Sequence, residues 1–257
     1  MIFVAAGTQD GRELVGQLLQ AGHRVIASVV SSYGEQLLLR YGTDQLQVND
    51  VPLDETALRT YLKEHAVRCF IDASHPYAVN VSIYAMAACR QLHIPYIRYE
   101  RQVSAIAYAK LFRVQTYEEA ANQAALLGKR IFLTTGSRNL ACFMQSPAIA
   151  GCSLTIRVLP VPEVLAACTE LGFTPANIIA MQGPFSAGLN QELFKKYEAD
   201  VIVTKNSGTL GGTDTKLEAA MQLELPVVMI DRPKLCYTNI TYSFAGVFDF
   251  IQTKMTK

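Results

Sequence analysis

AAGTQDGREL, residues 5–14, places a glycine turn between an apolar run and a helical pattern. The run before it, residues 2–6, is apolar at every position, as a strand buried on both faces of a parallel sheet requires. The helical pattern continues over residues 11–21. A strand, a glycine turn and a helix are typical of the first unit of a doubly wound α/β fold. The segment therefore predicts a Rossmann-like domain at the start of the chain.

This turn has two interpretations. Backbone N–H groups at a helix start attract phosphate, which predicts a cofactor site at Gly7, Thr8 and Gly11. Ser31, after the second predicted strand, is a further candidate for cofactor binding. However, the full G-x-G-x-x-G fingerprint is absent, and no acid follows that strand to bind a ribose diol. The alternative is a tight strand–helix connection without a ligand.

Apolar runs and helical patterns alternate along nearly the whole chain, which predicts an α/β fold. The series restarts after about residue 102, so we predict two Rossmann-like, doubly wound parallel-sheet domains, residues 1–101 and 102–257. The predicted strands are residues 2–6, 24–28, 45–48, 69–73, 96–99, 112–115, 130–134, 154–159, 178–181, 201–204 and 227–230. The predicted helices are residues 11–21, 56–65, 79–92, 117–127, 162–171, 187–197, 216–223 and 244–253. The last of these can pack on either domain.

The composition excludes several classes of protein. Half of the 257 residues are hydrophobic and the net charge is +1, so nothing attracts the chain as a whole to nucleic acid or to an anionic membrane. The six cysteines form no C-x-x-C pair, which argues against a protein metal site or a disulfide framework. The first apolar run is too short for a signal peptide or a membrane span. We expect a cytoplasmic protein, either a monomer or a small homo-oligomer.

FIDASHPYA, residues 70–78, places polar side chains where an apolar strand ends. Asp72 and His75 are candidates for proton transfer, since an imidazole titrates near neutral pH. Ser74 is a candidate ligand contact, and the ring of Tyr77 can stack on a flat ligand. Alternatively, Ser74 or His75 only caps a helix that Pro76 begins.

The second half contains two further polar turns. TTGSRNL, residues 134–140, places Gly136 before Ser137 and Arg138 at an expected helix start, and the arginine can bond an oxyanion. The alternative is an N-capped helix with a solvated arginine. TKNSGTLGGTDTKLEAA, residues 204–220, places Lys205 at a strand end and Lys216 on the next helix. A loop so rich in glycine is costly to order, which favours a ligand site over a surface loop.

Each of these turns follows the carboxyl end of a predicted strand, where open α/β sheets bind ligands. With two domains, such ends can face one another across an interdomain cleft. MQGPFS, residues 181–186, lies at another strand end, with Ser186 as an expected helix cap. PYIRYER, residues 95–101, contributes Arg98 and Arg101, which either face the cleft or form surface ion pairs.

In this order, AGTQDGREL, DASHPYA, IPYIRYER, TTGSRNL, MQGPFS and TKNSGTLGG resemble the precorrin-6A reductase family of cobalamin biosynthesis. The resemblance covers most of the chain. It implies an NAD(P)H-dependent oxidoreductase acting on a CH–CH group, with the reduced nicotinamide held in the interdomain cleft. It implies hydride transfer to a ring double bond of precorrin-6A, or of its cobalt complex, to give the corresponding precorrin-6B. A proton completes the reduction.

Members of the oxygen-dependent route resemble one another in a serine–alanine–glycine–arginine run after the second strand. Residues 30–34 of this chain lack that arginine, the natural partner of a 2′-phosphate. This favours the anaerobic route, a cobalt-containing substrate and NADH. NADPH and the oxygen-dependent route are the alternatives.

The implied substrate carries many carboxylates, so a nearly neutral protein must bind it with locally placed cations. The catalytic candidates are His75, Asp72 and Lys205, with Tyr77 as a further proton donor. The cofactor candidates are Gly7, Thr8, Gly11, Ser31, Gly136, Ser137 and Arg138. The substrate candidates are Ser74, Tyr77, Arg98, Arg101, Asn206, Ser207, Gly208 and Lys216.

Three other functions fit the sequence less well. A short-chain dehydrogenase needs a tyrosine with a lysine four residues later, and no tyrosine here has one. A non-catalytic dinucleotide sensor would not need the second polyanion site predicted at residues 205–216. A tetrapyrrole methyltransferase needs a pocket for S-adenosylmethionine, and no stretch of this sequence indicates one.

Overall fold

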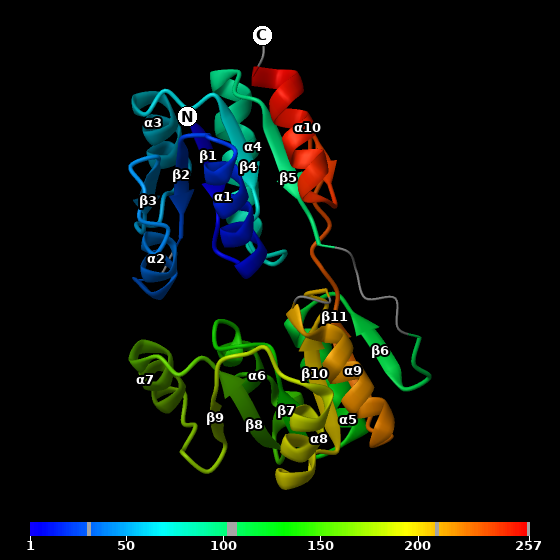
Figure 1. Cartoon of the computed structure of the whole chain (residues 1–257). Coiled ribbons are helices and arrows are strands. Elements are labelled where there is room, and N and C mark those ends of the chain that lie inside the picture. Colours follow the sequence, from blue (N-terminus) through cyan, green and yellow to red (C-terminus); the bar gives the residue numbers. More distant parts are fainter. Residues whose placement is uncertain (30–31, 102–106, 209–210, 256–257) are drawn as a thin grey trace. The chain divides into compact units, whose positions relative to one another are not determined.

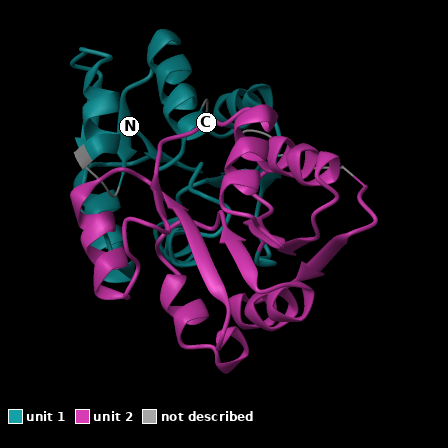
Figure 2. Ribbon diagram, turned by 90° about the horizontal axis from the view of Figure 1, so that it is seen from below, with its two compact units in different colours: residues 1–101, 233–257 teal, residues 102–232 magenta. Residues whose placement is uncertain are grey.

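The computed structural model describes residues 1–29, 32–101, 107–208 and 211–255, which form two parallel sheets of six strands each (Figure 1). The chain divides into two compact units (Figure 2). Unit 1 combines Met1–Arg101 with Pro233–Lys257, and unit 2 is Gln102–Arg232. This architecture confirms the predicted α/β fold with two doubly wound sheets. The predicted cleft between the domains stays a prediction.

The sheet of unit 1 has the strand order β12-β5-β4-β1-β2-β3. Its strands are β1 (Ile2–Ala5), β2 (Val25–Ser28), β3 (Leu46–Asn49), β4 (Cys69–Asp72), β5 (Tyr96–Tyr99) and β12 (Ile240–Thr241). Its helices are α1 (Gln9–Gln20), α2 (Ser32–Leu39), α3 (Glu55–Glu64), α4 (Val79–Leu92) and α10 (Phe244–Met255).

Alternate residues of β1 enter two different apolar clusters, as the two-residue period of a strand requires. Ile2 and Val4 pack with residues of α1 and α10, whereas Phe3 packs with residues of α3 and α4. Burial on both faces explains why the strand is apolar at every position. The final helix, α10, contributes Val247 and Ile251 to the first cluster and therefore packs on unit 1.

The sheet of unit 2 has the strand order β6-β11-β10-β7-β8-β9. Its strands are β6 (Leu111–Val114), β7 (Arg130–Leu133), β8 (Ser153–Val158), β9 (Ile178–Ala180), β10 (Val201–Lys205) and β11 (Val227–Ile230). Its helices are α5 (Tyr117–Leu127), α6 (Leu140–Met144), the 3₁₀ helix η1 (Pro147–Ile149), α7 (Pro162–Glu170), α8 (Ala187–Lys196) and α9 (Thr213–Gln222).

Each sheet has a point where the direction of winding reverses. In unit 1 the chain moves from β1 to β2 and β3, and then crosses to β4 on the other side of β1. In unit 2 the reversal lies between β7 and β10. Ligands of open α/β sheets bind beyond the strand ends at such a point. The four turns that flank the two reversals are AAGTQDGREL, FIDASHPYA, TTGSRNL and TKNSG.

Several predicted helix starts were wrong. α1 begins at Gln9 rather than residue 11, because the Thr8 hydroxyl accepts from the Gly11 N–H and caps the helix. α6 begins at Leu140 rather than at Ser137, and α9 begins at Thr213 rather than residue 216. The expected cap at Ser186 is confirmed, since its hydroxyl accepts from the N–H of Leu189.

The capping interpretation of FIDASHPYA was also wrong. α4 begins at Val79, and its N-cap residue, Ala78, forms no side-chain capping bond. Neither Ser74 nor His75 caps a helix beginning at Pro76, so their positions need another reason. Three short elements, α2, η1 and β12, were not predicted. No described helix is long and apolar enough to cross a membrane.

Candidate functional site

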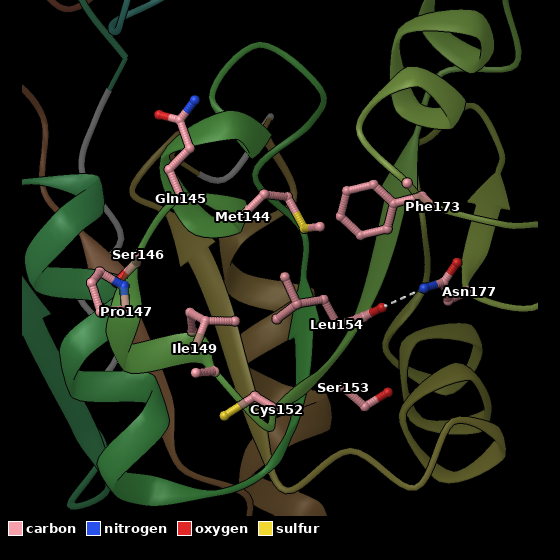
Figure 3. Close-up of a pocket in the computed structure, with 12 residues that line it drawn as sticks. Met144, Gln145, Ser146, Pro147, Ile149, Cys152, Ser153, Leu154, Phe173 and Asn177 are labelled. Atoms are coloured by element: carbon pink, nitrogen blue, oxygen red, sulfur yellow. Dashed lines mark hydrogen bonds between the residues drawn. The ribbon is translucent and has the colours of Figure 1, made fainter.

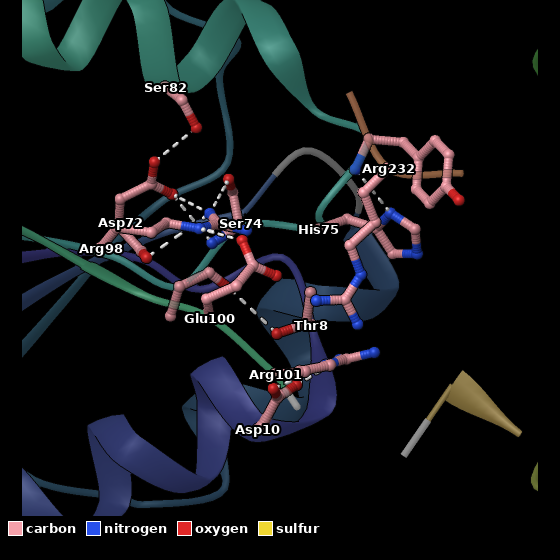
Figure 4. Close-up of polar contacts among 12 residues, drawn as sticks. Thr8, Asp10, Asp72, Ser74, His75, Ser82, Arg98, Glu100, Arg101 and Arg232 are labelled. Carbon is pink, nitrogen blue, oxygen red and sulfur yellow. Dashed lines mark hydrogen bonds and ion pairs between the residues drawn. The ribbon is translucent and has the colours of Figure 1, made fainter. Parts of the chain in front are cut away.

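The carboxylate of Asp72 is the centre of a buried polar network at the end of β4 (Figure 4). Its Oδ1 accepts from Arg98 Nη1 at 2.7 Å and from the Ser74 N–H at 3.0 Å. Its Oδ2 accepts from the hydroxyls of Ser82 at 2.5 Å and Tyr96 at 2.8 Å. With this set of donors, Asp72 is satisfied as an anion and ties the turn after β4 to β5 and α4.

The charges within this network offset one another. Burial by itself would raise the pKa of Asp72, but Arg98 and the hydroxyl and N–H donors outweigh burial and lower it. Arg98 also donates from Nε to Glu100 at 3.0 Å and lies 5.4 Å from the ring of Tyr237. Arg98 is 1% exposed, so this predicted substrate contact is enclosed by protein partners.

The turn after β4 presents His75 from a fixed backbone. Ser74 is anchored twice, by its N–H on Asp72 and by its hydroxyl, which accepts from Arg98 Nη1 at 3.0 Å. The Nδ1 of His75 accepts from the Tyr77 N–H at 3.3 Å, and the two rings lie 5.6 Å apart. With Nδ1 as the acceptor, the neutral imidazole carries its proton on Nε2.

The two glycines of the turn after β1 have different surroundings. A Cβ on Gly11 would lie 3.0 Å from Ala6 Cα and 3.1 Å from the carbonyl oxygen of Ala73, so only glycine lets α1 approach the sheet this closely. A Cβ on Gly7 would meet nothing within 4 Å. Thr8 joins the two turns of unit 1, because its hydroxyl donates to the Ala73 carbonyl at 3.0 Å.

An ion pair shields the first turn of α1. Asp10 is buried there and accepts from Arg101 through both carboxylate oxygens, with Nε to Oδ2 at 2.7 Å. Burial would raise the pKa of Asp10, but its bonds with Arg101 lower it. Arg101, a predicted substrate contact, therefore neutralises an acid that would otherwise repel an anion at this helix start. The predicted cofactor residue Ser31 lies outside the described residues.

Polar contacts hold the loop after β10 in place. The Ser207 N–H donates to the hydroxyl of Thr213 at 3.1 Å, and Arg232 Nε donates to the carbonyl of Asn206 at 2.7 Å. Gly208 has a φ of +76°, a left-handed conformation that favours glycine. Asn206 and Ser207 are buried, so their candidate ligand contacts depend on few accessible atoms.

Four cations of unit 2, Arg138, Arg157, Lys205 and Lys216, act on one another near the carboxyl edge of its sheet. Burial, and then Arg138, lower the pKa of Lys205 at the end of β10 to about 8. Burial, and then Arg157 and Lys205, lower the pKa of Lys216 to about 7. Both lysines therefore release protons near neutral pH, a property that is frequent at functional sites.

Arg157, the fifth residue of β8, was not among the predicted site residues. It is 5% exposed, its Nη1 donates to Asn190 Oδ1 at 2.7 Å, and its guanidinium carbon lies 4.0 Å from the ring centre of Phe185. Burial lowers the pKa of Arg157 to about 10. An arginine within the apolar run LTIRVL, near the carboxyl end of a buried strand, was the signal that could have found it.

The turn after β7 borders a hollow of about 450 Å³. The hollow is lined by Ser137, Arg138, Ala141, Glu163, Val164, Ala167, Glu170 and Leu171. Gly136, with a φ of +77°, has open space at its Cβ position. Of the three cofactor candidates in TTGSRNL, Ser137 and Arg138 thus border a space that a ligand can enter.

A second hollow of unit 2, about 470 Å³, lies near the start of β8 (Figure 3). It is lined by Met144, Gln145, Ser146, Pro147, Ile149, Ala150, Cys152, Ser153, Leu154, Gly172, Phe173 and Asn177. None of these residues is charged and none is a predicted site residue. The carboxyl edge of the sheet, with its cations, is therefore the better candidate site.

Comparison with known proteins identifies one family. The model of the family described as precorrin-6x reductase CbiJ/CobK matches residues 1–252. The cobalt-precorrin-6A reductase of Priestia megaterium is 40% identical over 248 residues, which cover 96% of each chain. The cobalt-precorrin-6A reductase of Salmonella typhimurium is 37% identical over 234 residues, covering 90% of this chain and 87% of that protein.

Two further relatives extend the comparison. The precorrin-6A reductase of Mycobacterium tuberculosis is 30% identical over 244 residues, covering 91% of this chain and 89% of that protein. A solved structure described as CobK precorrin-6A reductase superposes with a TM-score of 0.78 at 25% identity, covering 98% of this chain and 96% of that one.

Proposed function

Because the chain belongs to the precorrin-6x reductase CbiJ/CobK family, we propose that it reduces cobalt-precorrin-6A to cobalt-precorrin-6B with a reduced nicotinamide cofactor. Membership confirms the resemblance inferred from the ordered motifs. The chain is therefore a precorrin-6A reductase, an oxidoreductase of cobalamin biosynthesis with a tetrapyrrole substrate. The cobalt-containing substrate, the cofactor and the residue roles are the proposal.

The cofactor proposal rests on the two glycines of AAGTQDGREL. In dinucleotide-binding turns one glycine lets the helix pack closely on the strand, and another leaves room for the pyrophosphate beside the backbone. Gly11 fits the first role and Gly7 the second. This pair is the observation that carries the proposal, and Thr8, which caps α1, completes the turn. Gly136, Ser137 and Arg138 are proposed as further contacts of the cofactor.

When bound, the reduced nicotinamide supplies a hydride to one carbon of the ring double bond and becomes oxidised. The other carbon needs a proton, for which we propose the Nε2 of His75 in its imidazolium form. Forming the imidazolium places a proton on Nδ1, so the bond from the Tyr77 N–H must be released first. Asp72 is proposed as a positioning residue instead of a proton donor, because its lowered pKa keeps it ionised and Ser74 depends on it. Lys205, with a pKa near 8, is the second candidate donor.

The substrate proposal rests on charge. A macrocycle with several carboxylates needs cations that are not already paired with protein acids. Lys216, unlike Arg98 and Arg101, forms no ion pair with a carboxylate among the described residues. We therefore place the carboxylate-binding side chains in unit 2. Tyr77, Asn206, Ser207 and Gly208 are proposed as neutral contacts of the substrate.

The choice of cobalt-precorrin-6A follows the names of the relatives, and the choice of NADH follows residues of this chain. The chain is 40% and 37% identical to two cobalt-precorrin-6A reductases but 30% identical to a precorrin-6A reductase. NADH is preferred because residues 30–34 lack an arginine for a 2′-phosphate. A cytoplasmic location is proposed because all six cysteines are free thiols, as is usual in a reducing compartment.

The test is anaerobic mixing of the purified protein with cobalt-precorrin-6A or with precorrin-6A, and with NADH or NADPH. The absorbance of the reduced nicotinamide reports turnover. We expect oxidation that is faster with the cobalt substrate and with NADH. Turnover with NADPH alone would overturn the cofactor choice. Binding of both ligands without oxidation of either cofactor would overturn the enzyme and support a dinucleotide sensor.

A further inference from the structure

Two buried cations of unit 2 have no carboxylate partner among the residues that the structure describes. Arg157 is 5% exposed and Lys216 is 9% exposed. Within residues 1–29, 32–101, 107–208 and 211–255, neither forms an ion pair. Of the nitrogens of Arg157, only Nη1 has a hydrogen-bond partner in those ranges, and Lys216 Nζ bonds only the carbonyl of Gly211 at 3.1 Å.

This arrangement is unfavourable for folding alone. Burying a charge without a counter-ion costs several kcal/mol, and proteins usually pair such a group or replace it. Here the two cations also act on each other, since Arg157 lowers the pKa of Lys216. Unit 1 provides the contrast, because its buried Arg98 lies against Asp72 and Glu100. An uncompensated pair of cations at a sheet edge is instead what a site for an anion requires.

The fold places Arg157 and Lys216 where a parallel sheet can bind an anion. Arg157 lies near the carboxyl end of β8, immediately after Ile156, which is in register with Leu133 at the end of β7. Its guanidinium plane is held by Asn190 of α8 and by the ring of Phe185. Lys216 lies in the first turns of α9, which packs on α8 and whose amino end attracts negative charge.

We propose that Arg157 and Lys216 bind one oxyanion group of a ligand at the carboxyl edge of the sheet in unit 2. The inference rests on the proposed function for the identity of that group, which is either a carboxylate of the macrocycle or a phosphate of the cofactor. Arg157 provides the fork of donors that matches either group, and Lys216 provides the point charge. Asn190 and Phe185 are positioning residues, because they orient the guanidinium.

The first test needs no turnover. The thermal midpoint of the whole chain is measured in potassium phosphate and in potassium chloride of equal ionic strength at pH 7. We expect phosphate to raise the midpoint by about 2–4 °C for wild type and for Lys195→Met. Lys195 is a matched control, because it is exposed on α8 and pairs with Glu192. Arg157→Met and Lys216→Met lose the phosphate effect, and an effect retained in both variants would overturn the inference.

The second test identifies the source of the oxyanion. In Arg157→Met, a KM for cobalt-precorrin-6A raised about 10- to 100-fold, with the KM for the cofactor unchanged, assigns a carboxylate. The reverse pattern assigns a phosphate. Arg157→Lys keeps the charge without the fork and should lie between wild type and Arg157→Met. Unchanged KM values for both ligands in Arg157→Met would overturn the inference, and an inactive wild type that still responds to phosphate would overturn only the proposed function.

Discussion

The carboxylate of Asp72 lies 2.7 Å from the guanidinium of Arg98, and both side chains are almost completely buried. Such a pair is costly to bury, so it stabilises the fold only when further hydrogen bonds satisfy both groups. Here the hydroxyls of Ser82 and Tyr96 donate to the carboxylate of Asp72, and the carboxylate of Glu100 accepts from Arg98. The network holds three predicted site residues, Asp72, Ser74 and Arg98, and it fixes the turn that presents His75.

Asp72→Asn should destabilise the protein. The change removes the anion and leaves the buried charge of Arg98 with fewer acceptors, which typically costs about 3–5 kcal/mol of unfolding free energy. Urea unfolding measures the loss. The exposed pair of Arg113 and Asp231 provides the control, and Arg113→Met should cost less than about 1 kcal/mol. A cost of Asp72→Asn as small as that of the control would contradict the structural role of the network.

Lys216→Met should stabilise the protein while it impairs ligand binding. The pKa of Lys216 is about 7 in the folded chain, against the ordinary 10.5, because of burial and because Arg157 and Lys205 face it. Below pH 7 the folded protein therefore bears the full cost of the buried charge. Between pH 7 and 10.5 the unfolded chain binds more protons, so this cost declines as pH rises.

Urea unfolding at pH 6.5 and pH 9.5 measures this effect. At pH 6.5 the variant should gain roughly 1–4 kcal/mol over wild type, and the gain should be smaller at pH 9.5. An equal gain at both pH values would show that packing, and not the charge, is responsible. Lys195→Met, which removes an exposed lysine of α8, should leave stability nearly unchanged at both pH values.

His75→Gln should lower kcat by about 100- to 10,000-fold, the range for loss of a general acid, with little change in KM. Wild-type kcat should fall at alkaline pH, because a general acid must be protonated, and this fall should disappear in the variant. His23→Gln, a change in the turn between α1 and β2, is the control. If the alkaline fall persists in His75→Gln and disappears in Lys205→Gln, the proton comes from Lys205.

The two glycines of AAGTQDGREL should respond differently to substitution. Gly7→Val should keep the unfolding free energy within about 0.5 kcal/mol, because its Cβ position is open, and should raise the KM for the cofactor tenfold or more. Gly11→Ala should cost about 1–3 kcal/mol, because the added carbon lies 3.0 Å from Ala6 Cα. A Gly7→Val enzyme with an unchanged KM for NADH and NADPH would move the cofactor proposal to the turn at Gly136.

Local pattern was enough to predict most of the fold. The helices α4 and α5 and the strands β5 and β11 have the predicted bounds, since each is bounded by a proline, a glycine or a capping residue close in sequence. One of the elements that were missed depends on a distant partner. β12 is two residues long and exists because it pairs with β5, far away along the chain. A segment so short carries no periodicity.

The sequence by itself determined the α/β class, the doubly wound sheets and the four polar turns, because apolar periodicity and glycine placement are local properties. Only the tertiary structure decided what each charge does. Arg98 and Arg101 are paired with acids 26 and 91 residues away, whereas Arg157, inside an apolar strand, has no acid partner among the described residues. Burial and the nearest opposite charge decide whether an arginine stabilises the fold or can bind a ligand, and both depend on which distant segments the fold brings together.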